Sequence, residues 1–169
     1  MSTCKATMAV ALLCLVTTGC VQAKQKIIGP NLISVEETAR VAKEQGGLDT
    51  VSSVDLTTNG PTYRIVSGFD STGRAKAVWV EDRFLFAEYL DRGISREKAL
   101  EIARREGLTG PLATQLLYVS PWVKANIRTV LKNSDTEVFW WVRDPGVELK
   151  YELYLDFYNG SIVYKRMIE

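Results

Sequence analysis

Histidine is absent from this sequence, and its three cysteines, Cys4, Cys14 and Cys20, all lie within the first twenty residues. The commonest general base and the commonest metal ligand are therefore both missing. Beyond Cys20 the chain can form no disulfide, no thiolate metal site and no thiol nucleophile. A net charge of +1 gives no global reason to expect nucleic acid or an anionic surface as a partner. These absences exclude many kinds of active site.

The remaining reactive groups, carboxylates and hydroxyls, show no pattern typical of catalysis. The Asp and Glu residues fall at expected helix caps, turns and outer strand faces, where a solvated structural role is favoured. The sequence has no G-x-S-x-G motif, although composition alone leaves a Ser–Lys dyad open. Metal binding without His or Cys would need a cage of oxygen ligands, and the turn at 70–73 is too short for an EF-hand. We therefore expect no enzyme, no cofactor and no metal site.

The N-terminus has the pattern of a secretory signal or membrane anchor. Eighteen uncharged residues separate Lys5 from Lys24, with a short apolar run and small residues at its end. Residues 1–23 are therefore set apart from the folded part of the chain. A stretch of this length also reaches the lower limit for a single membrane span.

Three fates of this segment remain open. Thr17–Cys20 resembles a bacterial lipobox, in which Cys20 is lipidated and becomes the first residue of the mature protein; a threonine stands where leucine is usual. Val21–Ala23 offers a rival cleavage site for simple secretion, and an uncleaved anchor is the third possibility. All three place the folded part outside the cytoplasm, at the outer face of the membrane if it is anchored.

A short helical phrase occurs twice in the chain. Residues 34–46 and 95–107 share identical residues at four equivalent positions: Ser34/Ser95, Glu36/Glu97, Ala42/Ala103 and Gly46/Gly107. Each copy begins with a serine able to cap a helix, is acidic early and basic late, and ends at a glycine suited to a left-handed C-cap. Strand-like sequence follows both copies. This pattern predicts a duplicated α+β unit.

The first unit is expected over residues 33–82. Glu37, three positions after Ser34, would complete a capping box. Alternation and turn signals predict strands at 51–56, 63–67 and 75–80, with turns at 58–61 and 70–73. One helix on such a three-stranded meander has a small core, so we expect the two units to dock. Residues 83–93 form the linker, either as an edge strand or as a short bridging helix.

The second unit is expected over residues 94–169, with its helix beginning at Ser95. Strands are predicted at 136–143, 149–157 and 162–168, joined by turns at 144–146 and 158–161. In the first of these strands Val138, Trp140 and Val142 share one face, and Phe139 and Trp141 share the other. Residues 111–132 show no clear pattern and are left unassigned.

Three phrases resemble a known family. They are Ala77–Val80, Gly93–Ala99 and the C-terminal Tyr151–Gly160 hairpin. Together they resemble the YpmB/TseB-type proteins of Gram-positive bacteria, over roughly 34–169. The resemblance implies an α+β fold of two tandem cystatin-like modules behind an N-terminal anchor, the second module being PepSY-like. The chain departs from the pattern in its possible lipobox and in an expanded segment at 111–132.

The same resemblance implies a function. It points to a non-enzymatic regulator of cell-wall elongation that acts on a penicillin-binding protein at the outer face of the cytoplasmic membrane. PepSY-like modules also occur as inhibitory segments of secreted peptidases, so an anchored peptidase inhibitor is the alternative. A purely structural envelope lipoprotein is a third possibility.

Trp122 and Trp141 are the candidate partner-binding residues. Trp122 stands beside Pro121 in the expanded segment, and aromatic residues are favoured at the centres of interfaces. Trp140 and Trp141 point to opposite faces of one strand, so one of them could be exposed; burial of both is the alternative. Trp79 is expected to pack within the first unit.

Overall fold

A computed structural model describes residues 32–57, 62–126, 131, 134–144 and 150–168. The first module contains α1 (Val35–Glu44), β1 (Thr50–Thr57), β2 (Tyr63–Phe69), β3 (Ala75–Val80) and β4 (Phe84–Tyr89), followed by the 3₁₀ helix η1 (Leu90–Arg92). The second contains α2 (Arg96–Arg105), β5 (Ala113–Tyr118), α3 (Pro121–Asn126), β6 (Val138–Arg143), β7 (Lys150–Asp156) and β8 (Ile162–Ile168). Among all the residues that the structure describes, no helix is long and apolar enough to cross a bilayer.

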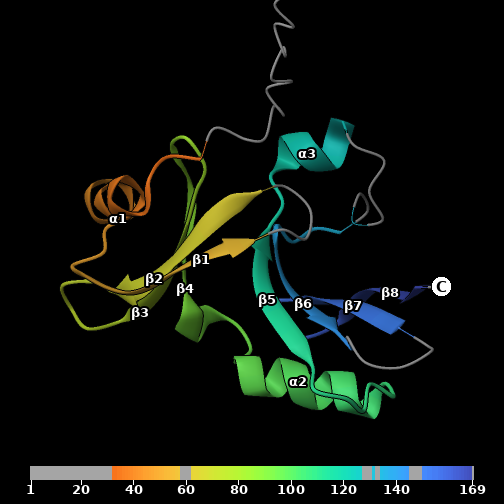
Figure 1. Cartoon of the computed structure of the whole chain (residues 1–169). Coiled ribbons are helices and arrows are strands. Elements are labelled where there is room, and N and C mark those ends of the chain that lie inside the picture. The colour runs from red at the N-terminus through yellow and green to blue at the C-terminus, as the bar shows by residue number, and fades with distance from the viewer. Residues whose placement is uncertain (1–31, 58–61, 127–130, 132–133, 145–149, 169) are drawn as a thin grey trace, which may run out of the picture.

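Each module is an antiparallel meander preceded by a helix (Figure 1). The strand orders are β1-β2-β3-β4 and β5-β6-β7-β8, so both sheets have four strands in the order of the sequence. The first sheet was expected to have three strands; the fourth is β4, which pairs with β3 along the sheet edge. Within the 83–93 linker, Phe84–Tyr89 thus form an edge strand and Leu90–Arg92 form a short 3₁₀ helix, so the structure contains both of the expected alternatives. The segment left unassigned supplies β5 and α3.

The repeated phrase forms the two predicted helices. The Ser34 hydroxyl accepts a hydrogen bond from the Glu37 backbone N–H at 3.1 Å, and the Ser95 hydroxyl accepts one from the Lys98 N–H at 3.2 Å. Both serines thus satisfy backbone donors that the first turn leaves without a partner. The capping box is not completed, because the Glu37 carboxylate accepts hydrogen bonds from the Arg40 guanidinium instead.

Gly46 and Gly107, which follow α1 and α2, have different structural roles. Gly107 has φ 95°, the left-handed conformation expected for it. After α1 that conformation belongs to Gly47, with φ 70°, and not to Gly46 as the repeat suggested. A Cβ on Gly46 would lie 2.5 Å from the Ala42 carbonyl oxygen and 2.7 Å from the Val78 side chain. Gly46 therefore lets the end of α1 approach the sheet closely.

The hydrophobic residues form one core inside the first module and a larger one between the modules. α1 covers one face of the first sheet, where its buried side chains meet those of β2 and β3: Val41, Ala42, Leu48, Val66, Val78 and Val80. The opposite face of that sheet presents Tyr63, Ile65, Ala77 and Trp79 to the second module. There these residues join a single cluster with α2 and the inner face of β5–β7. The expected docking of the two units is confirmed.

Two side chains show how closely the modules are joined. The buried Tyr63 hydroxyl donates to the Tyr118 carbonyl at 2.9 Å and accepts from the Tyr118 N–H at 2.7 Å. Trp79 is fully buried, and its indole N–H lies 3.4 Å from the Leu116 carbonyl oxygen. Trp79 was expected to pack within the first module, but its face of β3 is the docking face. Residues of the first module therefore complete the hydrogen bonding of β5.

Candidate functional site

The structure places the candidate partner residue Trp122 on the surface of α3, with 69 % of it exposed. α3 is held in place from both sides. The Ser120 hydroxyl accepts from the Val123 N–H at 3.3 Å, and the Lys124 ammonium donates to the carbonyls of Ser134 and Thr136 at 2.9 and 2.8 Å. Lys124 thus ties the helix to the chain that leads into β6. Trp122 is displayed on a short element that the fold fixes in position.

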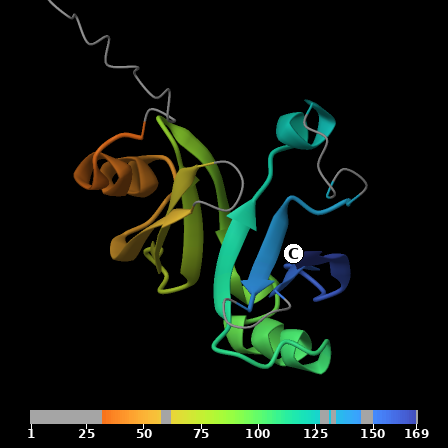
Figure 2. The same ribbon diagram turned by 45° about the vertical axis from the view of Figure 1, so that its right-hand side comes forward.

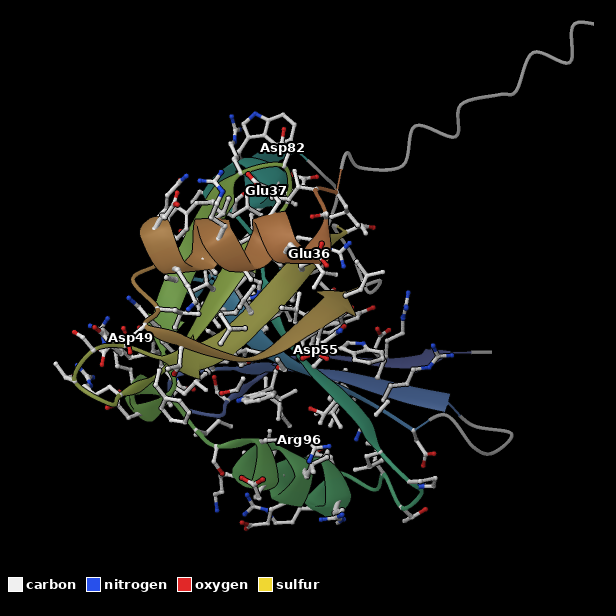
Figure 3. The ribbon with its side chains drawn as sticks, turned by 60° about the vertical axis from the view of Figure 1, so that its left-hand side comes forward. Glu36, Glu37, Asp49, Asp55, Asp82 and Arg96 are labelled. Atoms are coloured by element: carbon white, nitrogen blue, oxygen red, sulfur yellow. The ribbon has the colours of Figure 1, made fainter. Side chains whose placement is uncertain are left out.

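A small pocket with one carboxylate in its lining lies beside α3. A pocket of about 80 Å³ lies between α3 and the turn after β3, lined by Tyr63, Glu81, Leu85, Tyr118, Ser120 and Val123. Exposed Asp82 lies in the same turn as Glu81 and is labelled in Figure 3. We call Trp122, Val123, Glu81 and Leu85 the α3 surface. It combines a large exposed ring, a small apolar depression and a carboxylate.

Trp141, the other candidate partner residue, is only 5 % exposed, so the expectation that it meets a partner is corrected. Its indole N–H donates to the Glu152 carboxylate on the neighbouring strand. The face of the second sheet that carries Trp141 is covered in part by α3 and by Leu131, because Val123 and Leu131 pack there with Phe139. Cys20, the candidate lipidation site, lies outside the described residues.

Three carboxylates are buried, against the expectation that the acidic residues would be solvated: Glu88, Asp144 and Glu152. Besides Trp141, Glu152 accepts hydrogen bonds from the Tyr154 hydroxyl at 2.9 Å and from the Arg166 guanidinium at 2.6 Å. Burial, followed by the nearby Glu152 charge, raises the pKa of the Tyr154 hydroxyl. Alternation had placed Glu152 on an outer face, and no local pattern indicated that other residues cover this face. These donors give Glu152 a structural role.

Glu88 joins the modules at a second point. Its carboxylate accepts from the Tyr158 hydroxyl at 2.7 Å and from the Arg92 guanidinium at 3.2 Å. Burial of the ring, then the Glu88 carboxylate, raises the pKa of Tyr158 to about 12. Tyr158 lies in the second module and Glu88 on β4, so this hydrogen bond adds to the Tyr63–Tyr118 contact.

Among the described residues, neither the Ser95–Lys98 pair nor any cluster of acidic side chains has the geometry of a nucleophile or a metal site. Ser95 and Lys98 have the S-x-x-K spacing, but the Ser95 hydroxyl caps α2 and the Lys98 ammonium binds Glu101 at 3.0 Å. Across the described ranges, no three His, Cys, Asp or Glu side chains gather in a way that could hold a metal ion. Glu88 instead links β4 to Tyr158 of the second module, and Glu152 links β7 to Arg166 of β8.

A cleft of about 410 Å³ lies between the modules. It is lined by Asp55, Leu56, Ile65, Ser67, Ala77, Leu90, Arg96, Thr114, Gln115, Leu116 and Trp140. We call it the intermodule cleft. Asp55 lies on β1 and Arg96 at the start of α2, and Figure 3 shows them on opposite sides of the space between the first sheet and α2. Near its rim the Gln115 amide donates to the Leu56 carbonyl at 3.0 Å.

The intermodule cleft was not foreseen from the sequence, because its walls meet only when the modules dock. Figure 2 shows the two sheets facing each other, with α2 closing the space below. One signal was present in the sequence. The alternation of β2 and β3 places apolar Ile65 and Ala77 on the face away from α1, which indicates a second buried surface.

Comparison with known proteins supports the fold. No family model matches the sequence, and neither does any curated protein. Among solved structures, YpmB from Bacillus subtilis superposes with a TM-score of 0.60 over 80 % of this chain and 98 % of that one. The chain has the fold of YpmB. At 24 % identity, the likeness to YpmB concerns architecture: two antiparallel four-stranded sheets with few helices.

Proposed function

We propose that this protein is a non-enzymatic, membrane-anchored regulator of cell-wall elongation that binds a penicillin-binding protein outside the cytoplasm. In this proposal both modules are cystatin-like, the second is PepSY-like, and the N-terminal segment anchors the chain, by a lipid on Cys20 or as a span. The observation that carries the binding role is the exposure of Trp122 on a fixed helix. The YpmB-like fold supports the family context.

The α3 surface has the composition expected of a contact site. Tryptophan is enriched among residues that dominate binding energy, and it contributes most where its ring can be fully desolvated by a partner. Trp122 is the most exposed of the large hydrophobic residues described here, and the adjacent pocket could accept a small apolar side chain. The nearby Glu81 would favour a partner with a basic rim.

A pull-down with the full chain from detergent-solubilised native membranes tests this function. We expect a penicillin-binding protein to be retained, and Trp122→Ala to reduce its recovery by more than about tenfold, as truncation of a central interface tryptophan does. Phe69→Ala is the matched control, because Phe69 is also an exposed aromatic, at 45 %, but lies at the end of β2. Equal recovery with both variants would contradict a role for Trp122.

The identity of the retained protein separates the alternatives. Recovery of a secreted peptidase, with inhibition of its activity by the added chain, would favour the anchored inhibitor. For the anchor, mass spectrometry of the mature N-terminus is decisive, since lipidation requires a modified Cys20 as the first residue. An unmodified N-terminus at Met1 or Lys24 would contradict the lipobox.

A further inference from the structure

We infer that the intermodule cleft binds a small zwitterion, an amino acid or short peptide whose carboxylate pairs with Arg96 and whose ammonium group pairs with Asp55. This site is separate from the α3 surface, and it does not depend on the proposed regulator function. Three features of the cleft support this inference: its size and lining, its two opposite charges and one buried hydroxyl.

The size and lining suit a small ligand with an apolar side chain. Ligand sites commonly measure about 300–1,000 Å³ and combine apolar walls with a few polar groups. The cleft measures about 410 Å³. Its apolar wall comes from both modules, with Ile65 and Ala77 on the first sheet and Leu116 and Trp140 on the second. This wall is held by the shared core, so it is formed before any ligand arrives.

The charges stand on opposite sides of the cleft and are available to a ligand. Arg96 is exposed and makes no ion pair or hydrogen bond with the other described residues. Asp55 is also exposed and accepts a hydrogen bond on Oδ2 from the Ser53 hydroxyl, at 2.9 Å. The bond to Ser53 orients the Asp55 carboxylate, and its other oxygen remains able to accept. A guanidinium suits a carboxylate and a carboxylate suits an ammonium group, so the pair selects a ligand carrying both charges.

A buried hydroxyl gives a second, independent indication. Thr114 Oγ1 is inaccessible to solvent and has no hydrogen-bond partner among the described residues, although Thr114 lines the cleft. Most buried polar atoms in proteins find a partner, and those that do not call for an explanation. A small shift of the side chains that cover this hydroxyl would open it to the cleft, and a peptide or carboxylate oxygen of the ligand would then accept its hydrogen bond. Thr114 is then a positioning residue for the ligand.

The test is a titration of the isotope-labelled full chain in detergent micelles, followed by NMR. The probe is glycyl-leucine, and the two capped probes are N-acetyl-glycyl-leucine and glycyl-leucine amide. We expect glycyl-leucine to shift the Trp140 indole and Thr114 amide resonances at millimolar concentration. Each cap should weaken binding by up to about fivefold, the upper end of the range for a partly exposed ion pair. Arg96→Gln should weaken the binding of glycyl-leucine to the same extent. In this variant glycyl-leucine and glycyl-leucine amide should bind equally.

Asp55→Asn should likewise remove the effect of the acetyl cap. Arg105→Gln is the matched control, because Arg105 is an exposed arginine on the same helix, 63 % exposed and away from the cleft lining. It should leave binding unchanged.

Thr114→Val separates ligand binding from folding. Because the hydroxyl is buried without a partner, its replacement should leave thermal stability unchanged or raised. At the same time it should weaken glycyl-leucine severalfold. The inference is overturned if no probe shifts the cleft resonances, or if capped and free dipeptides bind equally. Equal losses for Arg96→Gln and Arg105→Gln would also overturn it.

Discussion

Replacing Tyr63 by phenylalanine should weaken the junction between the modules while leaving the packing of the ring unchanged. Tyr63 is 2 % exposed, and its hydroxyl bridges the N–H and the carbonyl of Tyr118. Tyr63→Phe removes one donor and one acceptor and leaves two buried backbone groups unsatisfied. Each such group costs about 1–3 kcal/mol, so for the two groups we expect a loss of about 2–6 kcal/mol in the free energy of unfolding.

The assay is urea unfolding of the wild type and the variant, supported by a thermal melt. For a chain of this length the loss corresponds to a fall in Tm of roughly 4–24 °C. Tyr164→Phe is the matched control, because the Tyr164 hydroxyl makes no hydrogen bond to the other described residues and the change should stay within about 0.5 kcal/mol. Similar losses for the two variants would refute the reasoning, since the bridge would then not stabilise the junction.

Three further perturbations probe other parts of the structure. Glu152→Gln should cost about 1–3 kcal/mol in urea unfolding, because a carboxylate that accepts from three donors is replaced by an amide whose NH2 group cannot accept. Arg166→Gln should cost at least as much, because it leaves the buried Glu152 carboxylate without its counter-charge, and a smaller loss would contradict this. The pKa of Tyr158 is raised from 10.0 to about 12. The stabilising contribution of the Tyr158–Glu88 hydrogen bond is therefore complete below pH 10 and is lost as pH rises through 12. Tyr158→Phe and Glu88→Gln should each reduce the fall in Tm at alkaline pH. An unchanged fall would contradict the raised pKa of Tyr158. Gly46→Ala should cost about 1–3 kcal/mol in the same urea assay, because the added methyl group would meet a helix carbonyl oxygen at 2.5 Å; a neutral change would show that α1 can move away from the sheet.

Local sequence patterns predicted most of the helices and strands. The serine caps gave both helices, and alternation gave β1, β2, β3, β6, β7 and β8. β4 could not be assigned in the same way, because both of its faces are covered by apolar groups. Phe84 and Ala87 pack on the core under α1, and Leu85 and Phe86 pack on the shared core. A strand buried on both sides loses the alternation that identifies a strand.

The candidate sites were less predictable, because they depend on contacts between distant residues. The same alternation that placed Trp141 on an outer face could not show that α3 and Leu131 help to cover that face. Asp55 and Arg96 are forty-one positions apart, and only the docking of the modules brings them to one cleft. Trp122 could be proposed from its setting beside Pro121, and the structure adds its exposure. Its partner remains a proposal.

The way the modules dock also bears on self-association. The first module uses its helix-free face to contact the helix side of the second, which is a head-to-tail arrangement. The second module has the corresponding helix-free face, and repetition of the same contact would produce an open-ended filament. In this chain, Val123 of α3 and Leu131 lie on that face against Phe139. Val123 and Leu131 therefore cover part of the surface that such a repeated contact would use, as the polar outer face of a terminal capping repeat does in a repeat array.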